Sequence, residues 1–153
     1  MKIEPSITSI DDLAALPGQT VGWYGVRNYL ARNYMRDQMR LGDLAFYYHS
    51  SCPEPGIAGV VRVSRESYAD PTQFDPESEY FDPKATRAAP RWFQVEVTLV
   101  RKFPLVPLSV LRQTAGLEQM VVLQRGNRLS ITPVSVKEWR ILTGSLDIIP
   151  GVN

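Results

Sequence analysis

The stretch Trp23-Tyr24-Gly25-Val26-Arg27-Asn28-Tyr29-Leu30-Ala31-Arg32-Asn33 predicts an aromatic loop that leads directly into a helix. The first turn of a helix leaves backbone N–H groups free, and a base that stacks on an aromatic ring gains roughly 1–3 kcal/mol. Gly22 and Gly25 permit a close approach of a ligand to the backbone. The loop therefore has the groups needed to hold a flat heterocycle, with Trp23 against its face and the backbone and Asn28 at its edge. Composition alone favours the alternative that Trp23 is a core residue fixing the loop to a sheet.

The helix that begins in this stretch is predicted to extend over about residues 28–40. Residues four apart lie on one face of a helix, so Arg32, Arg36 and Arg40 form a basic stripe. One interpretation is that these arginines contact phosphates beside a bound base. The alternative is a solvated helix face with arginines paired to acidic neighbours such as Asp37.

Hydrophobic patterns predict three strands, over residues 43–49, 57–63 and 92–100. The third alternates apolar and polar residues, which is typical of a strand with one face on the core. A short helix is expected over residues 107–113. Two more helices begin with capping boxes, in which a serine and an acidic residue three positions later bond reciprocally. These pairs are Ser9 with Asp12 and Ser135 with Glu138.

A long irregular segment, about residues 68–90, separates the second and third strands and contains Asp-Pro three times. Residues before proline avoid the helical region and aspartate favours turns, so little regular structure is expected. Loops of this length are commonly functional or disordered. Phe74, Tyr80 and Phe81 favour order, because aromatic side chains can attach a loop to the body of a domain.

The chain of 153 residues has a formal net charge of +1, unlike proteins that bind nucleic acid mainly by neutralising phosphates. Its length suits one domain, and no apolar run approaches the roughly 20 residues that cross a bilayer. The N-terminus lacks the apolar segment of a cleaved signal. Cys52 is the only cysteine and His49 the only histidine, which fits a reducing compartment and excludes a zinc site built from several such ligands. We expect a cytoplasmic domain with no membrane contact, no metal and no cofactor.

No catalytic motif is present: the sequence has no Gly-rich phosphate loop, no nucleophile elbow and no paired metal-ligand spacing. His49 has the pKa range of a general base, but spacing assigns no carboxylate or nucleophile to it. We therefore predict a binding domain and not an enzyme. Two alternatives stay open. One is a small enzyme that acts on a modified nucleotide with His49 as its base, and the other is an adaptor that binds a protein through the 68–90 loop.

Motifs along nearly the whole chain resemble those of the EVE domain family, part of the PUA-like superfamily that also includes PUA, ASCH and YTH domains. The matching segments are Lys2-x-Glu4-Pro5, residues 22–33, Gly42-Asp43, Tyr48-His49-Ser50, residues 57–59, Asp70-Pro71, Trp92 with the strand after it, and Arg128-Leu129-Ser130. The resemblance implies an α+β domain of PUA-like fold, with a curved, mostly antiparallel, β-barrel-like sheet flanked by short helices. We assign this domain to residues 1–144 and a C-terminal tail to residues 145–153.

The resemblance also implies a function, because members of this family look like domains that bind modified bases. It implies that this chain binds DNA or RNA through methylated or hydroxymethylated cytosine, or another modified base, in an aromatic pocket walled by Trp23. We expect the domain to be a monomer. By position, the residues implied to surround that pocket are Lys2, Glu4, Trp23, Gly25, Val26, Arg27, Asn28, Tyr29, His49, Ser50 and Arg128.

The sequence departs from the family pattern at two places. It begins at Met1-Lys2, without the aromatic strand that usually precedes a Lys-Ser-Glu-Pro motif, and Ile3 stands where serine is usual. The first strand is therefore expected to be short. Leu30 replaces a common glutamine, so a polar contact is expected to be lost there.

Overall fold

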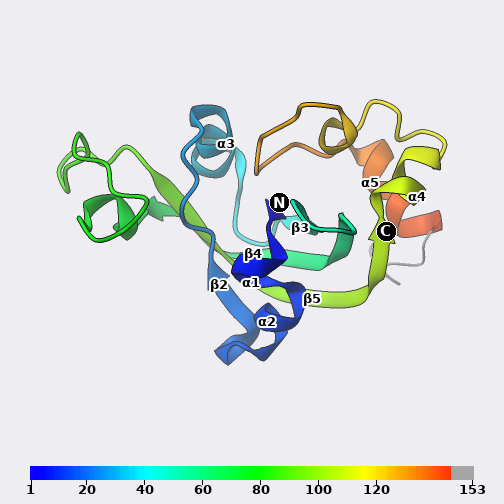
Figure 1. Ribbon diagram of the computed structural model, residues 1–153, viewed down its shortest axis with the longest axis horizontal. Coiled ribbons are helices and arrows are strands. Elements are labelled where there is room, and N and C mark those ends of the chain that lie inside the picture. The colour runs from blue at the N-terminus through cyan, green and yellow to red at the C-terminus, as the bar shows by residue number, and fades with distance from the viewer. Residues whose placement is uncertain (146–153) are drawn as a thin grey trace.

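A curved ribbon of two long antiparallel strands, β4 (Gly56–Ala69) and β5 (Phe93–Pro107), spans the computed structural model (Figure 1), which describes residues 1–145. On one side β3 (Leu44–His49) pairs antiparallel with β4, and β1 (Lys2–Ile3) pairs parallel with β3. On the other side β2 (Thr20–Gly22) pairs antiparallel with β5. The sheet order is thus β1-β3-β4-β5-β2. This five-stranded mixed sheet with short helices confirms the predicted α+β class.

The three strands predicted from hydrophobic pattern are all present, but two are longer than predicted. β4 continues past Val63 because its second half remains paired with β5, through irregularities in the register around Arg65 and Tyr68. The two strands that the pattern did not predict, β1 and β2, have 2 and 3 residues. Segments this short show no period, and pairing with distant strands defines them.

Both faces of β3 are buried, each against a different core. Phe46 and Tyr48 pack into one apolar cluster with Ile57 and Val60. Tyr47 points the other way, into a second cluster that also contains Trp23. The alternation of a strand places successive side chains on opposite faces, so β3 connects the two cores.

Two short helices, α2 (Ile10–Ala15) and α5 (Val136–Ser145), start where their capping boxes predict. In α2 the Ser9 hydroxyl accepts from the Asp12 N–H at 3.0 Å, and the Ser9 N–H donates to the Asp12 carboxylate at 2.8 Å. Ser135 and Glu138 make the same reciprocal bonds before α5. Four other short helical segments are α1 (Pro5–Thr8), η1 (Pro17–Gln19), α4 (Leu108–Gln113) and η4 (Val121–Leu123).

The helix predicted over residues 28–40 is shorter than expected and changes type. α3 (Tyr29–Asn33) is α-helical, and η2 (Tyr34–Gln38) is a wider π-helical turn that closes with the Met39 N–H bonded to the Tyr34 carbonyl at 3.1 Å. Ala31 and Met35 face the core, whereas Leu30 is exposed.

The segment between β4 and β5 extends from one end of the sheet (Figure 1) and contains η3 (Pro71–Phe74). Gln73 is fully buried and joins both ends of the segment. Its Nε2 donates to the Asp70 and Trp92 carbonyls, each at 2.8 Å, and its Oε1 accepts from the N–H groups of Arg91 and Trp92 at 2.9 and 3.0 Å. All four hydrogen-bonding positions of the amide are therefore used, and the loop is ordered, as its aromatic residues predicted.

No helix within residues 1–145 is long and apolar enough to cross a membrane. Of the predicted tail 145–153, Ser145 ends α5, and residues 146–153 lie outside the described residues.

Candidate functional site

A cavity of about 570 Å³ lies where the N-terminus, the segment that contains Trp23 and the chain after η4 come together. Its volume is in the range of small-molecule sites, roughly 300–1,000 Å³. The lining residues are Lys2, Ile3, Glu4, Ile7, Thr8, Val21, Gly22, Trp23, Tyr24, Gly25, Val26, Arg27, Asn28, Ser50, Ser51, Tyr80, Asn127, Arg128 and Ser130. Nine of the eleven predicted pocket residues are among them, from Lys2 to Arg128. A second cavity, about 340 Å³, lies between η2 and the 131–139 segment and includes none of them.

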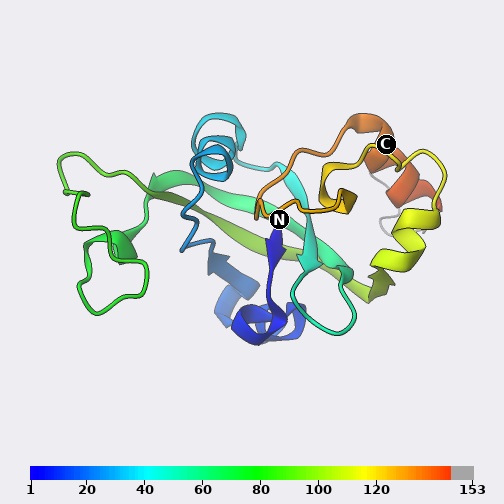
Figure 2. The same ribbon diagram turned by 45° about the horizontal axis from the view of Figure 1, so that its top comes forward.

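Three distant segments meet at the N-terminal side of the cavity, and backbone hydrogen bonds hold them together. The Lys2 N–H donates to the Ser130 carbonyl at 2.7 Å, and the Ser50 N–H donates to the Ile3 carbonyl at 2.8 Å. The Lys2 ammonium donates to the Asn127 carbonyl at 3.0 Å. Figure 2 shows the chain after η4 running back to the N-terminus. This assembly places a cation, Lys2, in the cavity wall, where partial burial lowers its pKa.

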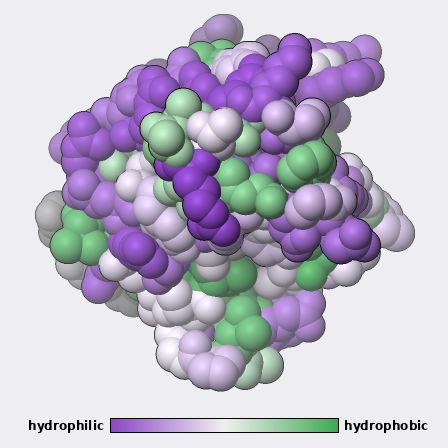
Figure 3. Space-filling view, turned by 90° about the vertical axis from the view of Figure 1, so that its left-hand side faces the viewer, coloured by the Kyte–Doolittle hydropathy of each residue, from purple (hydrophilic) through white to green (hydrophobic). Residues whose placement is uncertain are grey.

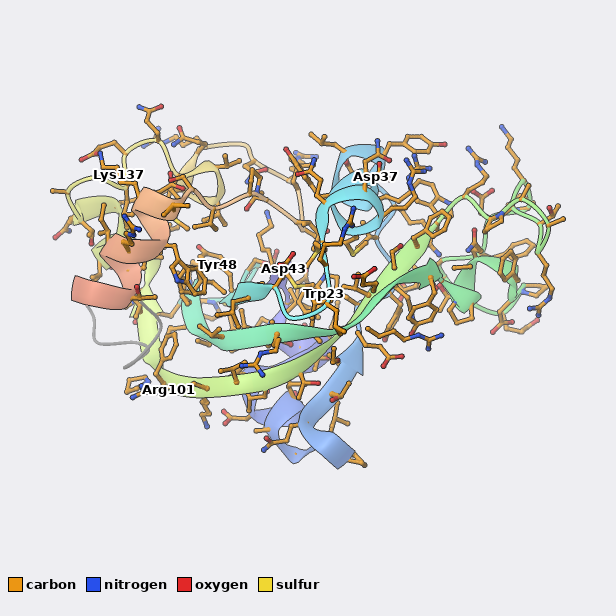
Figure 4. The ribbon with its side chains drawn as sticks, turned by 180° about the vertical axis from the view of Figure 1, so that it is seen from behind. Trp23, Asp37, Asp43, Tyr48, Arg101 and Lys137 are labelled. Atoms are coloured by element: carbon orange, nitrogen blue, oxygen red, sulfur yellow. The ribbon has the colours of Figure 1, made fainter. Side chains whose placement is uncertain are left out.

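Trp23 borders the cavity but is otherwise part of the core. Only 4% of the residue is exposed, and its ring meets Tyr47 edge-on, with centroids 5.5 Å apart. Figure 4 shows Trp23 beside the middle of the sheet. The indole N–H has no hydrogen-bond partner within residues 1–145, yet it is not sealed from solvent. Trp23 is therefore both a core residue and a residue of the cavity wall. Because so little of it is exposed, it presents only an edge of the indole to the cavity.

Arg27 lines the cavity with every donor already engaged. Its Nε and Nη2 donate to the Tyr80 carbonyl at 3.2 and 2.7 Å, and Nη2 also donates to the Thr72 hydroxyl at 3.0 Å. Its Nη1 donates to the Val26 carbonyl at 3.2 Å and to the Asp70 carboxylate at 2.9 Å. A guanidinium has five N–H groups, so Arg27 forms a wall that fastens the long loop and has no donor left for a ligand.

Other predicted residues keep polar groups available to a ligand. The Asn28 Oδ1 caps α3 by accepting from the N–H groups of Leu30 and Ala31 at 2.9 and 3.1 Å, and its Nδ2 has no partner among residues 1–145. Glu4 and Arg128 are exposed at the cavity wall, and neither side chain is hydrogen-bonded within the described part of the chain. The cavity thus offers a carboxylate, two cations and an amide.

Two predicted residues, His49 and Tyr29, do not line the cavity. His49 Nε2 accepts from the Ile10 N–H at 3.1 Å, at the start of α2, and burial lowers its pKa. Tyr29 stacks on Trp92 with centroids 4.9 Å apart, outside the cavity. Within residues 1–145 no three His, Cys, Asp or Glu side chains cluster as a metal site would require.

The arginine stripe is largely engaged with its own helix. Arg36 pairs with Asp37 through bonds of 2.7 and 2.9 Å, and Arg40 donates to the Asp37 and Met39 carbonyls. Arg32 bonds Asn33 and the backbone of the long loop. None of the three lines the cavity, and Figure 4 shows Asp37 on the helical segment, away from Trp23. The arrangement resembles the acid-paired alternative more than a row of free phosphate contacts.

Sequence reasoning missed two aromatic residues of the site, Tyr24 and Tyr80. Tyr24 is 47% exposed and meets the Tyr80 ring edge-on, with centroids 5.9 Å apart. Tyr80 was predicted only to attach the long loop. Its position over Gly25 depends on how that loop folds back, and no local sequence signal indicates this.

Comparison with known proteins shows what this arrangement is similar to. A family model described as the EVE domain matches residues 1–144. Human thymocyte nuclear protein 1 is 43% identical over 139 residues, which cover 86% of this chain and 61% of that protein. The chain therefore spans less than two thirds of that relative's length.

Solved structures are similar over almost the whole fold. A protein from Pseudomonas putida has a TM-score of 0.89 and 48% identity, and the match covers 94% of this chain and 95% of that one. The human THYN1 protein, solved in complex with DNA that contains 5-methylcytosine, has a TM-score of 0.88 and 39% identity, with coverage of 98% of this chain and 97% of that one.

Proposed function

The chain belongs to the EVE domain family, and from this premise we propose that it binds DNA containing a modified base, with one extruded base taken into the cavity beside Trp23. The observation that carries the proposal is the cavity itself, which gathers nine predicted pocket residues in one place. The similarity to a protein solved with 5-methylcytosine DNA supports it, because the match covers 98% of this chain.

The polar groups of the cavity suit the edge of a cytosine. Carboxylates accept from the exocyclic amine of cytosine, and Glu4 offers such an acceptor at the cavity wall. The ring carbonyl and ring nitrogen accept hydrogen bonds, for which Asn28 and the Trp23 indole N–H are donors. A methyl group on the base needs an apolar surface, and Val21 and Val26 provide one in the same cavity.

Pocket contacts must supply much of the affinity. Extruding a base costs a few kcal/mol of unstacking, and a net charge of +1 gives little general attraction to DNA. Lys2 and Arg128 are the cations at the cavity wall whose donors are not fully engaged. A contact to the phosphates beside the extruded base fits their position.

We further propose that the chain acts as a binding module and not as an enzyme. The one histidine, His49, lies outside the cavity, and its Nε2 lone pair accepts from the Ile10 N–H. A general base needs a free lone pair within reach of the substrate. The placement of His49 therefore argues against the alternative in which this residue abstracts a proton from a nucleotide.

The test is a binding titration with a fluorescent duplex that carries one 5-methylcytosine, compared with the unmodified duplex and with RNA of the same sequence. We expect the methylated DNA to bind most tightly. Glu4→Gln and Arg128→Ala should each weaken binding severalfold with little effect on folding, because both side chains are exposed. Arg125→Ala is the control for Arg128, since Arg125 lies on the same segment outside the cavity. Equal affinity for methylated and unmodified DNA would refute base-specific reading.

A further inference from the structure

Resting on the proposed function, we propose that Tyr80 supplies the aromatic face on which the extruded base stacks. The long loop between β4 and β5 then forms part of the binding site, although it is distant in sequence from the Trp23 segment. The ligand class is a planar nucleobase, recognised by its π-face at Tyr80 and by its polar edge at the groups already described.

Trp23 cannot provide the stacking face. With 4% of the residue exposed, both faces of the indole are covered by the core, and Tyr47 meets it edge-on. Stacking requires contact over most of a ring face. Trp23 therefore contributes its edge to the cavity, and the face must come from another residue.

Two tyrosines line the cavity, Tyr24 and Tyr80, and Tyr80 is the one whose ring is held in place by its neighbours. Its ring lines the cavity and is partly exposed. Gly25 lies over one face of the ring, because a Cβ atom there would be 2.7 Å from Cζ and 2.9 Å from both Cε atoms, so a base stacks on the opposite face. The Arg27 guanidinium lies 5.3 Å from the ring centroid, and Tyr24 contacts the ring with its edge. These neighbours fix the ring before any ligand arrives, which reduces the entropy lost on binding.

The loop is held independently of the Tyr80 side chain. Arg27 bonds the main-chain carbonyl of Tyr80 at 2.7 and 3.2 Å, and Gln73 joins the two ends of the loop. Figure 3 shows the end of the molecule that this loop forms, where hydrophobic residues are scattered among hydrophilic ones. Replacement of the Tyr80 ring therefore leaves the loop in place and isolates the ring's contribution to binding.

The experiment compares Tyr80→Phe, Tyr80→Leu and Phe81→Leu with the wild-type protein, by titration with the 5-methylcytosine duplex and by thermal unfolding. Phe81 is the matched control, since it is an adjacent aromatic residue, 40% exposed, that does not line the cavity. We expect Tyr80→Leu to weaken binding roughly tenfold to a hundredfold through the loss of one stacking contact. Tyr80→Phe keeps the ring and should bind within a few-fold of wild type, and Phe81→Leu should bind as wild type does.

A second measurement uses the unaltered protein and so does not depend on how the variants fold. The methylated base is replaced by 5-iodocytosine, the complex is irradiated, and the crosslinked peptide is identified by mass spectrometry. We expect the crosslink at Tyr80. A crosslink at Trp23 instead, unchanged binding by Tyr80→Leu, or equal weakening by Tyr80→Leu and Phe81→Leu would each overturn the assignment while leaving the proposed function intact. Failure of the wild-type protein to bind methylated DNA would remove the proposed function and this inference with it.

Discussion

Replacing Asp70 by asparagine should destabilise the protein more than any other single carboxylate-to-amide change in the long loop. Asp70 is fully buried, and its carboxylate accepts four hydrogen bonds. Two come from the Gly25 N–H and Arg27 Nη1, both at 2.9 Å, and two from Thr72, at 2.8 Å from its N–H and 2.6 Å from its hydroxyl. An asparagine keeps one acceptor oxygen and turns an NH₂ group toward two of these donors.

The magnitude follows from the burial of the pair. Removing one partner of a buried ion pair costs about 3–5 kcal/mol, because the other charge is left uncompensated. Arg27 is 22% exposed, so water can relieve part of this cost and the lower end of the range applies. In a domain of this size each kcal/mol lowers the melting temperature by roughly 2–4 °C. We therefore expect Asp70→Asn to melt on the order of 10 °C below the wild type.

The assay is urea unfolding of Asp70→Asn beside Asp75→Asn, which alters another Asp-Pro pair of the same loop. Asp75 is exposed and bonds the Glu77 N–H, so its replacement should cost less than about 0.5 kcal/mol. Equal losses of stability in the two variants, or a loss of less than about 1 kcal/mol in Asp70→Asn, would refute the stabilising role of the buried Asp70–Arg27 pair.

The same carboxylate should make stability depend on pH in a defined direction. Burial alone raises the pKa of Asp70, but the hydrogen bonds from Thr72, Gly25 and Arg27 outweigh burial and hold the pKa below its usual value. A carboxyl group with a lowered folded-state pKa contributes stability above its unfolded pKa of about 4 and loses it as the pH falls through the folded value. The difference in unfolding free energy between wild type and Asp70→Asn should therefore be largest at neutral pH and decrease as the pH falls into the acid range.

Three further predictions concern other parts of the molecule. Burial lowers the pKa of His49, so the folded state binds the proton less readily than the unfolded state. Stability should therefore fall as the pH drops below about 6.5. In thermal unfolding, the melting temperature of His49→Gln should depend less on pH in this range than that of the wild type. Gln73→Leu leaves the Trp92 N–H without its partner and should cost roughly 2–6 kcal/mol in urea unfolding, and a loss under 1 kcal/mol contradicts the role given to this amide. If Lys2 and Arg128 are the phosphate contacts, the plot of log affinity against log salt should have a slope of about −2, whereas a slope near −4.5 would mean that the arginine stripe binds as well.

Local interactions explain why part of the fold could be predicted from the sequence. A capping box needs only residues three positions apart, so both boxes were found and both are formed. The faces of β3 follow from alternation alone. By contrast β1 and β2 exist only through pairing with β3 and β5, and the length of β4 depends on continued pairing with β5. The π-helical turn of η2 could not be predicted from the hydrophobic pattern either.

The same difference between local and long-range interactions determines which parts of the site could be predicted. The family resemblance selected the residues from Lys2 to Arg128 that line the cavity, yet it also selected His49, which is bonded to the start of α2 instead. The state of Arg27 could not be read from sequence, because its partners Asp70, Thr72 and Tyr80 follow it by 43 to 53 positions. Gln73 and Tyr80 reach their partners only when the loop folds back. The residue types at these positions therefore do not predict the contacts that they make.

The attachment of Arg27 to the main chain at position 80 has a consequence for how ligand preference can evolve. Every residue type has that carbonyl, so the bonds from Arg27 to the loop do not depend on which side chain stands at position 80. A substitution at this position therefore changes the pocket while Arg27 still holds the loop, although the contacts of the ring with Gly25 and Tyr24 are lost. A saturation library at position 80, selected against different modified bases, would sample new specificities on an unchanged scaffold.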